Sequence, residues 1–272
     1  MDSFSTWVKA RRDWLEVALL ETCAEFEPEE LRSACRYPLA TGGKRFRPLV
    51  CVAACEALGG APEAALLPAL ALELVHTFSL VHDDLPCMDD DNYRRGRPTI
   101  HSIHGEAVGM LVGDALLAEA FAVLAPAGPE QVRELARATG PGMVAGQYLD
   151  ITATPDIGVA ALERLHRAKT GALIQAAARM GGRAGQATPA ALEALTAYGD
   201  AVGLAFQLQD DVLDADQDRD PTGPPSFVKC LGLEATRARA LAELDRAILA
   251  VQGLPDPSRL IGLARFTVER SG

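Results

Sequence analysis

Two clusters of aspartates, far apart along the chain, are the residues best suited to chemistry. The first cluster comprises Asp83, Asp84, Asp89, Asp90 and Asp91, and the second comprises Asp210, Asp211 and Asp214. Crowded carboxylates repel one another and raise each other's pKa unless a cation neutralises them. Mg²⁺ takes oxygen ligands and bridges a few carboxylates to substrate phosphates. Together the two clusters predict magnesium held for a phosphorylated substrate.

The second cluster has helical spacing. Asp210 and Asp214 are four residues apart, and Gln207 precedes Asp210 by three. On a helix these three side chains share one face. That geometry suits one divalent ion.

The first cluster is less regular, because a continuous helix would place Asp83 and Asp89 on different faces. Pro86 lies between them and is expected to break the helix. A solvated surface turn is the ordinary explanation of a single acidic run. Here both clusters follow apolar, helix-like segments, at 72–82 and 201–209. That repetition favours two metal sites.

Basic residues are grouped close to the first acidic cluster. Lys44, Arg45 and Arg47 follow two glycines, and Arg94 and Arg95 lie just after the aspartates. Such cations bind diphosphate oxygens. Salt bridges on an exposed turn are the alternative for the second group. A diphosphate beside carboxylates meets repulsion of about 4 kcal/mol per close charge pair, so metal and guanidinium groups are both needed to reverse it.

Two further positions could take part in binding or catalysis. His76 lies seven residues before Asp83, on nearly the same helix face, and could hydrogen-bond a second diphosphate, although a lone histidine in an apolar helix is often a core residue. Gly171 follows Lys169 and Thr170 inside a helical run, where a kink would free backbone carbonyls to face a cation. A glycine packed against another helix is the alternative. The remaining histidines lack metal-binding spacing and are interpreted as structural: His82, His101, His104 and His166.

The elements that position these residues are predicted to be helices. Apolar residues recur every three or four positions through 46–58, 64–82, 105–124, 131–149, 159–180 and 190–214, and alternating strand patterns are almost absent. Helix breakers occur at 40–43, 59–62, 125–129, 181–182 and 221–225. None is long enough for an interdomain linker. We therefore expect an all-α fold with one domain over residues 1–272.

Composition excludes several classes of protein. A net charge of −11 argues against a nucleic-acid surface, and no uncharged apolar stretch reaches eighteen residues, which argues against a membrane span. The six cysteines show neither C-x-x-C pairs nor zinc-like spacing, and no segment resembles a signal peptide. A reducing cytoplasm is the expected location.

The motifs, in their order along the chain, resemble those of the short-chain trans-isoprenyl diphosphate synthases, particularly the bacterial farnesyl diphosphate synthases. They occupy 42–48, 76–101, 169–171 and 206–214, so the resemblance covers nearly the whole chain. It implies the all-α terpenoid-synthase fold, in which helices surround a central cavity and the two aspartate-rich motifs face each other.

The resemblance also implies a role for each site residue. Asp83, Asp84 and Asp89 would hold two Mg²⁺ and Asp210 a third, with Asp211 and Asp214 completing the second motif. The allylic diphosphate would be bound by Arg94, Lys169 and Gln207, and the carbonyls of Lys169 and Thr170 would face the allylic cation. Isopentenyl diphosphate would be bound by Lys44, Arg47, His76 and Arg95.

The implied reaction is condensation of isopentenyl diphosphate with dimethylallyl or geranyl diphosphate. In this family the residue five positions before the first aspartate sets product length, and here that residue is Phe78, beside the small Ser79. An aromatic floor favours the fifteen-carbon product, farnesyl diphosphate; geranyl and geranylgeranyl diphosphate are the alternatives. The resemblance also implies a homodimer. A terpene cyclase would share the metal-binding aspartates but would not need the second diphosphate pocket.

One segment departs from the family's pattern. The loop after Asp214 is shortened, and Pro224 stands where the family has a lysine. Lys229 cannot be assumed to replace it. Because closure of this loop excludes water from a carbocation, a weakly active or non-catalytic diphosphate-binding subunit is a second hypothesis.

Overall fold

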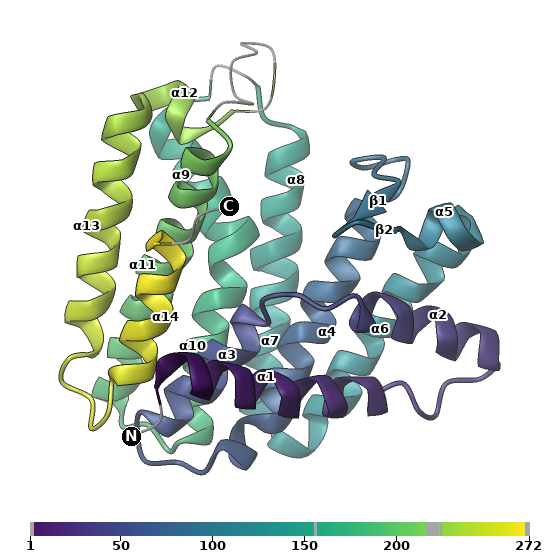
Figure 1. Ribbon diagram of the computed structural model, residues 1–272, viewed down its shortest axis with the longest axis horizontal. Coiled ribbons are helices and arrows are strands. Elements are labelled where there is room, and N and C mark those ends of the chain that lie inside the picture. Colours follow the sequence, from purple (N-terminus) through teal and green to yellow (C-terminus); the bar gives the residue numbers. More distant parts are fainter. Residues whose placement is uncertain (1–2, 155–156, 216–222, 224, 270–272) are drawn as a thin grey trace. The chain divides into compact units, whose positions relative to one another are not determined.

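Helices dominate the part of the chain that the computed structural model describes, which comprises residues 3–154, 157–215, 223 and 225–269 (Figure 1). Within these residues, β1 (Tyr93–Arg94) and β2 (Arg97–Pro98) form one short antiparallel pair. The predicted all-α fold is therefore confirmed. The chain divides into two compact units, residues 1–49 with 66–132 and residues 50–65 with 133–272. A single domain over 1–272 stays a prediction.

The first unit is built around one buried helix, α4 (Leu66–Asp83). Its apolar residues are too numerous for a one-sided stripe, and Leu72, Leu74 and Val75 are fully buried. Helix α4 packs against α1, α2 and α6. The other elements that lie in or begin in this unit are α1 (Phe4–Glu21), α2 (Glu29–Ala40), α3 (Phe46–Glu56), α5 (Ile100–His104), α6 (Glu106–Leu124), the 3₁₀ turn η2 (Ala125–Ala127) and α7 (Pro129–Arg137).

Two helical segments are long and apolar enough to cross a membrane, judged by length and composition alone: Pro62–Asp83 and Glu106–Ala127. This criterion tolerates two charged residues, which is why it selects helices that the stricter sequence expectation excluded. The first is 67% buried inside the protein and is a core helix, whereas the second is only 33% buried. On α6, Val112, Leu116 and Leu124 are buried, while Met110 and Leu111 are exposed.

The second unit is built around α11 (Pro189–Leu213), which packs against α10 and α13. Thr188 caps its start by accepting a hydrogen bond from the backbone of Ala191, and Pro189 occupies its first turn. The unit's other elements are the 3₁₀ turn η1 (Pro62–Ala65), the π-helical η3 (Ala138–Val144), α8 (Ala145–Ile151), α9 (Val159–His166), the π-helical η4 (Arg167–Gly171), α10 (Ala172–Ala184), α12 (Phe227–Leu231), α13 (Leu233–Val251) and α14 (Ser258–Glu269).

The predicted break at 181–182 is wrong, because both glycines lie inside α10. A Cβ atom on Gly181 would lie 1.9 Å from the carbonyl oxygen of Cys51, and one on Gly182 would lie 2.4 Å from the Leu195 side chain. These glycines therefore permit close packing of neighbouring segments without ending the helix. The connections predicted at 40–43 and 59–62 are confirmed.

Candidate active site

The first acidic cluster begins where α4 ends. The helix stops at Asp83, three residues before Pro86, as the sequence predicts. The chain then turns back, because the backbone N–H of Asp89 donates to the carbonyl of Asp83 over 2.8 Å. The turn brings two aspartates together that a continuous helix would have separated.

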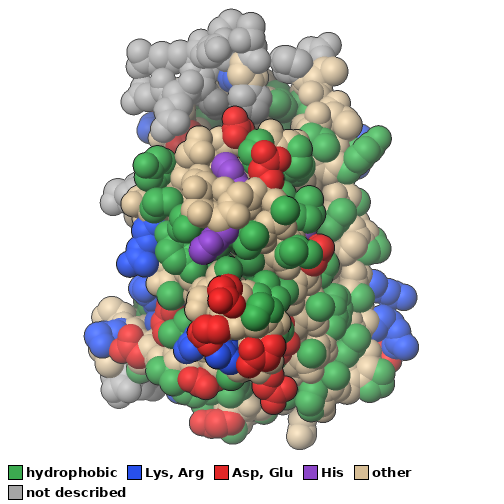
Figure 2. Space-filling view, turned by 90° about the vertical axis from the view of Figure 1, so that its right-hand side faces the viewer, with side chains coloured by type: hydrophobic (Ala, Val, Ile, Leu, Met, Phe, Trp, Pro, Cys, Tyr) green, Lys and Arg blue, Asp and Glu red, His purple; other side chains and the backbone are tan. Residues whose placement is uncertain are grey.

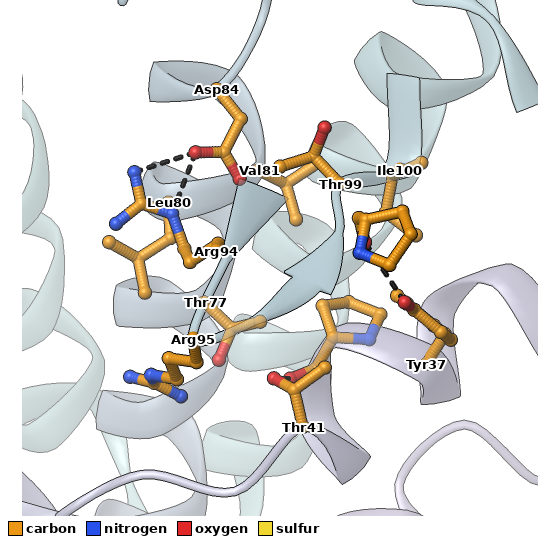
Figure 3. A pocket seen from close by; sticks show the side chains of 12 residues that line it. Tyr37, Thr41, Thr77, Leu80, Val81, Asp84, Arg94, Arg95, Thr99 and Ile100 are labelled. Atoms are coloured by element: carbon orange, nitrogen blue, oxygen red, sulfur yellow. Dashed lines mark hydrogen bonds and ion pairs between the residues drawn. The ribbon is translucent and has the colours of Figure 1, made fainter. Parts of the chain in front are cut away.

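Asp84 has a different environment from its neighbour. It is only 5% exposed, and Arg94 of β1 donates to its Oδ1 over 2.6 Å (Figure 3). Burial raises the pKa of Asp84, while the bonds from Arg94 oppose that rise. One predicted metal ligand and one predicted diphosphate ligand are therefore paired with each other in this structure.

Cations gather around His76 on α4. Burial lowers the pKa of His76 well below its ordinary value, and the nearby charges of Arg47 and Arg95 lower it further. A neutral imidazole there can hydrogen-bond an anion without adding a charge. Three of the four residues predicted to bind isopentenyl diphosphate are thus brought together, and exposed Lys44 lies three residues before Arg47.

Two loops meet at this cationic group. Nη1 of Arg95 donates to the carbonyl of Gly42. A Cβ atom at Gly43 would lie 2.7 Å from the same Nη1, so a side chain there would displace the guanidinium group of Arg95, and the positive φ angle of Gly43 also favours glycine. The hairpin that carries Arg95 is fixed in turn by Tyr37 of α2, whose hydroxyl donates to the carbonyl of Pro98 over 2.9 Å. Beneath the hairpin is a cavity of about 30 Å³, lined by residues such as Thr41 and Thr77 (Figure 3).

The residues predicted to set chain length follow His76 on α4. Phe78 is buried, and its ring packs edge-on against His82 with centroids 5.6 Å apart. The hydroxyl of Ser79 donates to the carbonyl of His76 over 2.9 Å. The bulky ring of Phe78 is thus held by its surroundings.

In the second unit, Lys169 and Thr170 lie in η4. The structure has a π-helical turn at this position, which shifts the backbone hydrogen bonds and is frequent at functional sites. A kink that frees carbonyls to face a cation stays a prediction. Thr170 donates to Gln207 over 3.2 Å, and Gln207 donates to Asp211 over 3.2 Å. These bonds link three predicted site residues, and Lys169 directly precedes Thr170.

Asp211 differs from the other two aspartates of its cluster. It is buried and accepts a hydrogen bond from the backbone N–H of Phe227 over 2.6 Å, which anchors the start of α12. Asp210 is partly exposed, and Asp214 is exposed and caps α11. Pro224 and the segment 216–222 lie outside the described residues.

Sequence reasoning missed the partners of Lys169 on α8. Its ammonium group pairs with Asp150, and a Cβ atom on Gly146 would lie 2.1 Å from the backbone nitrogen of Lys169. Gly146 and Asp150 are four residues apart, so they present one helix face to Lys169. No spacing in the sequence links these residues with Lys169, because the contact joins separate elements.

The four histidines interpreted as structural differ in their contacts and exposure. A ring nitrogen of His82 lies 3.0 Å from the carbonyl of Met110, and one of His101 lies 2.9 Å from the carbonyl of Asp91. His104 is exposed. His166 is buried against Phe227, and burial lowers its pKa to about 4.

Comparison with known proteins identifies the family. The polyprenyl synthetase family model matches residues 28–227. The chain is 39% identical to geranylgeranyl pyrophosphate synthase 12 of Arabidopsis thaliana, over 97% of this chain and 80% of that protein. It is 41% identical to the geranylgeranyl pyrophosphate synthase of Capsicum annuum, over 90% and 72% respectively.

Solved structures give the same result. A Zymomonas mobilis protein named an FPP/GFPP synthase has a TM-score of 0.90 and 36% identity, covering 97% of this chain and 98% of its own. A geranylgeranyl pyrophosphate synthetase from the archaeon Geoglobus acetivorans has a TM-score of 0.85 and 30% identity, covering 97% and 99%. The chain therefore belongs to the polyprenyl synthetase family of prenyltransferases and has the all-α terpenoid-synthase fold.

Proposed function

We propose that this protein condenses isopentenyl diphosphate with dimethylallyl or geranyl diphosphate to give farnesyl diphosphate. The observation that carries the proposal is the group formed by Arg47, His76 and Arg95, which lies in the same unit as the first acidic cluster. An enzyme that ionises one diphosphate, such as a terpene cyclase, needs no second anion site. A second cationic group fits a second diphosphate substrate.

Magnesium is the proposed cofactor, at three ions per site. The two clusters supply carboxylates, which suit a hard cation. Among the described residues, no three His, Cys, Asp or Glu side chains are already gathered around one point. Asp83, Asp84, Asp89 and Asp210 would therefore bind the ions together with diphosphate oxygens. When bound, Mg²⁺ would supply the charge that neutralises the departing diphosphate.

The chain's own residues have distinct roles in this proposal. Arg94, Lys169 and Gln207 hold the allylic diphosphate while its C–O bond breaks, and carbonyls of the π-helical turn η4 stabilise the allylic cation. Lys44 and the cationic group around His76 hold isopentenyl diphosphate so that its double bond attacks that cation. The released diphosphate takes the proton that is lost as the new double bond forms.

Product length has two supported candidates. The buried ring of Phe78 supports the fifteen-carbon product, since it would block a longer chain. The names of the relatives from Arabidopsis and Capsicum favour geranylgeranyl diphosphate instead. Incubation with labelled isopentenyl diphosphate and either dimethylallyl, geranyl or farnesyl diphosphate, followed by chromatography, distinguishes them. Extension of farnesyl diphosphate to twenty carbons would contradict the fifteen-carbon assignment.

A weakly active or non-catalytic subunit is the second candidate function, because the loop after Asp214 is shortened. Such a subunit would bind diphosphates with Mg²⁺ but extend none of the three starters. Calorimetric binding of isopentenyl diphosphate without any labelled product would support that candidate. Labelled product at a rate proportional to protein concentration would exclude it.

We also propose that the protein is a homodimer in a reducing cytoplasm. Ile103, Met110 and Leu111 expose large apolar side chains on α5 and α6, and Figure 2 shows hydrophobic groups between acidic ones on the side where α5 lies. Burying such side chains against the same face of a second copy would remove them from water. All six cysteines are free, which fits a reducing compartment.

A further inference from the structure

Arg45 is the most constrained charged residue of the loop before α3. It is only 2% exposed, and its φ angle of 48° lies in the left-handed region, which L-residues rarely adopt. Gly42 and Gly43 before it also have positive φ angles, 76° and 142°. Such a turn is unfavourable at a non-glycine residue and persists only when its surroundings enforce it.

Buried acceptors enforce this conformation. Nε and Nη2 of Arg45 donate to the two carboxylate oxygens of Glu16 on α1, each over 2.8 Å. Nη1 donates to Glu73 on α4 over 2.7 Å, and Nη2 also donates to the carbonyl of Leu39 on α2. One guanidinium group therefore ties the loop to three helices. The fork shape of arginine is required, because an ammonium group cannot make the paired bonds to Glu16.

The loop that Arg45 fixes carries the proposed ligands of isopentenyl diphosphate. Lys44 precedes Arg45 directly, and Arg47 follows by two residues. Glu73 lies one helical turn before His76 on α4, so the bond from Arg45 to Glu73 also relates the loop to the histidine. Arg95 reaches the same loop through the carbonyl of Gly42 (compare its position in Figure 3).

We infer that Arg45 is a positioning residue, which holds Lys44 and Arg47 in register with His76 so that together they bind isopentenyl diphosphate. It contacts no substrate itself, since its donors are occupied by Glu16, Glu73 and Leu39. This inference rests on the proposed function. Its specific consequence is that weakening the bonds of Arg45 weakens the binding of isopentenyl diphosphate but not of the allylic diphosphate.

The test compares Arg45→Lys and Glu16→Gln with wild type. Arg45→Lys keeps a charge but loses the fork, and Glu16→Gln keeps the shape of the acceptor but loses its charge. Glu134→Gln is the matched control, because it weakens a comparable carboxylate–guanidinium pair, with Arg179, that lies in the second unit. KM for isopentenyl diphosphate, KM for the allylic diphosphate, kcat and the thermal midpoint are measured for all four proteins.

We expect both loop variants to raise KM for isopentenyl diphosphate about tenfold while KM for the allylic substrate changes less than about twofold. The Glu134→Gln control is expected to lower the midpoint without changing either KM. Equal changes in both KM values, or none in a folded Glu16→Gln protein, would overturn the inference. If wild type extends no allylic starter, the proposed function has failed. The role of Arg45 is then tested by calorimetry, which measures the Kd of isopentenyl diphosphate for wild type and for Glu16→Gln. A Kd about tenfold higher in Glu16→Gln would support the inference, and an unchanged Kd would overturn it.

Discussion

Neighbouring aspartates in each acidic cluster have different surroundings. Asp84 is buried and paired with Arg94, whereas Asp83 is partly exposed and Asp89 is exposed. The second cluster repeats this division, since buried Asp211 holds the backbone of Phe227 while Asp214 is exposed. The buried members also hold the segments that follow, Asp84 through Arg94 and Asp211 through the backbone of Phe227.

Replacing Asp83 should affect turnover more than replacing His76. A metal-binding carboxylate serves the transition state, so we expect Asp83→Ala to lower kcat by about 10²–10³. His76→Ala removes mainly ground-state binding and should raise KM for isopentenyl diphosphate about tenfold with little change in kcat. Steady-state kinetics with both substrates measures the difference. Equal losses of kcat would count against this division of roles.

Phe78→Ala is expected to lengthen the product by at least one five-carbon unit, because removal of the ring deepens the proposed floor. Truncating a buried phenylalanine costs about 3–5 kcal/mol, so Phe78→Leu is the milder second variant. Chromatography of labelled products measures chain length. Phe266→Ala, which truncates an exposed ring on α14, is the control and should leave product length unchanged. The same distribution from Phe78→Ala and wild type would refute the assignment.

At the scale of elements, close approach of backbones determines how η4 is held. Gly146 of α8 lies directly against the backbone of Lys169, and Gly203 of α11 lies against Gly171. Glycines at these points let α8 and α11 contact the π-helical turn closely. The position of Lys169 and Thr170 therefore depends on residues that carry no functional group.

Gly146→Ala tests this dependence. An added Cβ would lie 2.1 Å from a backbone nitrogen, so η4 or α8 must move, at a cost of about 1–3 kcal/mol. We expect a lower thermal midpoint together with a severalfold loss of kcat. Gly140→Ala is the matched control, since its added Cβ would have no heavy atom within 4 Å apart from its chain neighbours and its own helix backbone. If both variants keep the kcat of wild type, α8 does not position Lys169.

An ion-pair ladder joins the helices around η4. Arg239 donates to Glu163 and Arg246 to Asp200, while Arg167 of η4 pairs with both carboxylates. Burial alone would raise the pKa of Glu163 and of Asp200, but the paired arginines outweigh it and lower both. The stabilising charges thus persist at pH values where an unfolded chain would already bind protons.

The ladder predicts a specific loss of stability in acid. The pKa values of Glu163 and Asp200 are lower in the folded protein than in the unfolded chain, where they are about 4. The ion pairs therefore contribute their full stabilisation above pH values of about 4, and this stabilisation is lost as the pH falls through the folded-state pKa values. We expect the unfolding free energy, measured by urea titration, to fall across this range. The double variant Glu163→Gln with Asp200→Asn should flatten that part of the profile. An unchanged slope in the double variant would contradict the role of the ladder.

The helical elements could be predicted because apolar residues that recur every three or four positions are visible within a short stretch of sequence. The predicted runs at 64–82, 105–124 and 190–214 coincide closely with α4, α6 and α11. The partners of Lys169 and Arg45 could not be predicted, since Asp150, Glu16 and Glu73 meet them only through packing of separate elements. The break assigned to 181–182 failed for the same reason, because a glycine that ends a helix and one that admits a neighbouring helix look alike in sequence.

At the scale of the whole molecule, the apolar face of α6 predicts association of two copies. Leu111 is 59% exposed in the single chain, and a charge placed at a buried dimer contact would be costly. We expect Leu111→Glu to shift the protein from dimer to monomer in sedimentation experiments. Leu249→Glu, at a 64% exposed position on α13, is the control and should stay dimeric. A wild-type monomer, or a dimeric Leu111→Glu protein, would contradict this interface.

We propose that both acidic clusters serve one condensation reaction, although the loop after the second cluster is shortened. The direct measurement is the initial rate of incorporation of labelled isopentenyl diphosphate into an allylic product, with Mg²⁺ or with chelator, for wild type and for Asp210→Asn. We expect steady chain extension by wild type with Mg²⁺, none with chelator, and a loss of at least tenfold in Asp210→Asn. No extension by folded wild-type protein with Mg²⁺ would contradict it.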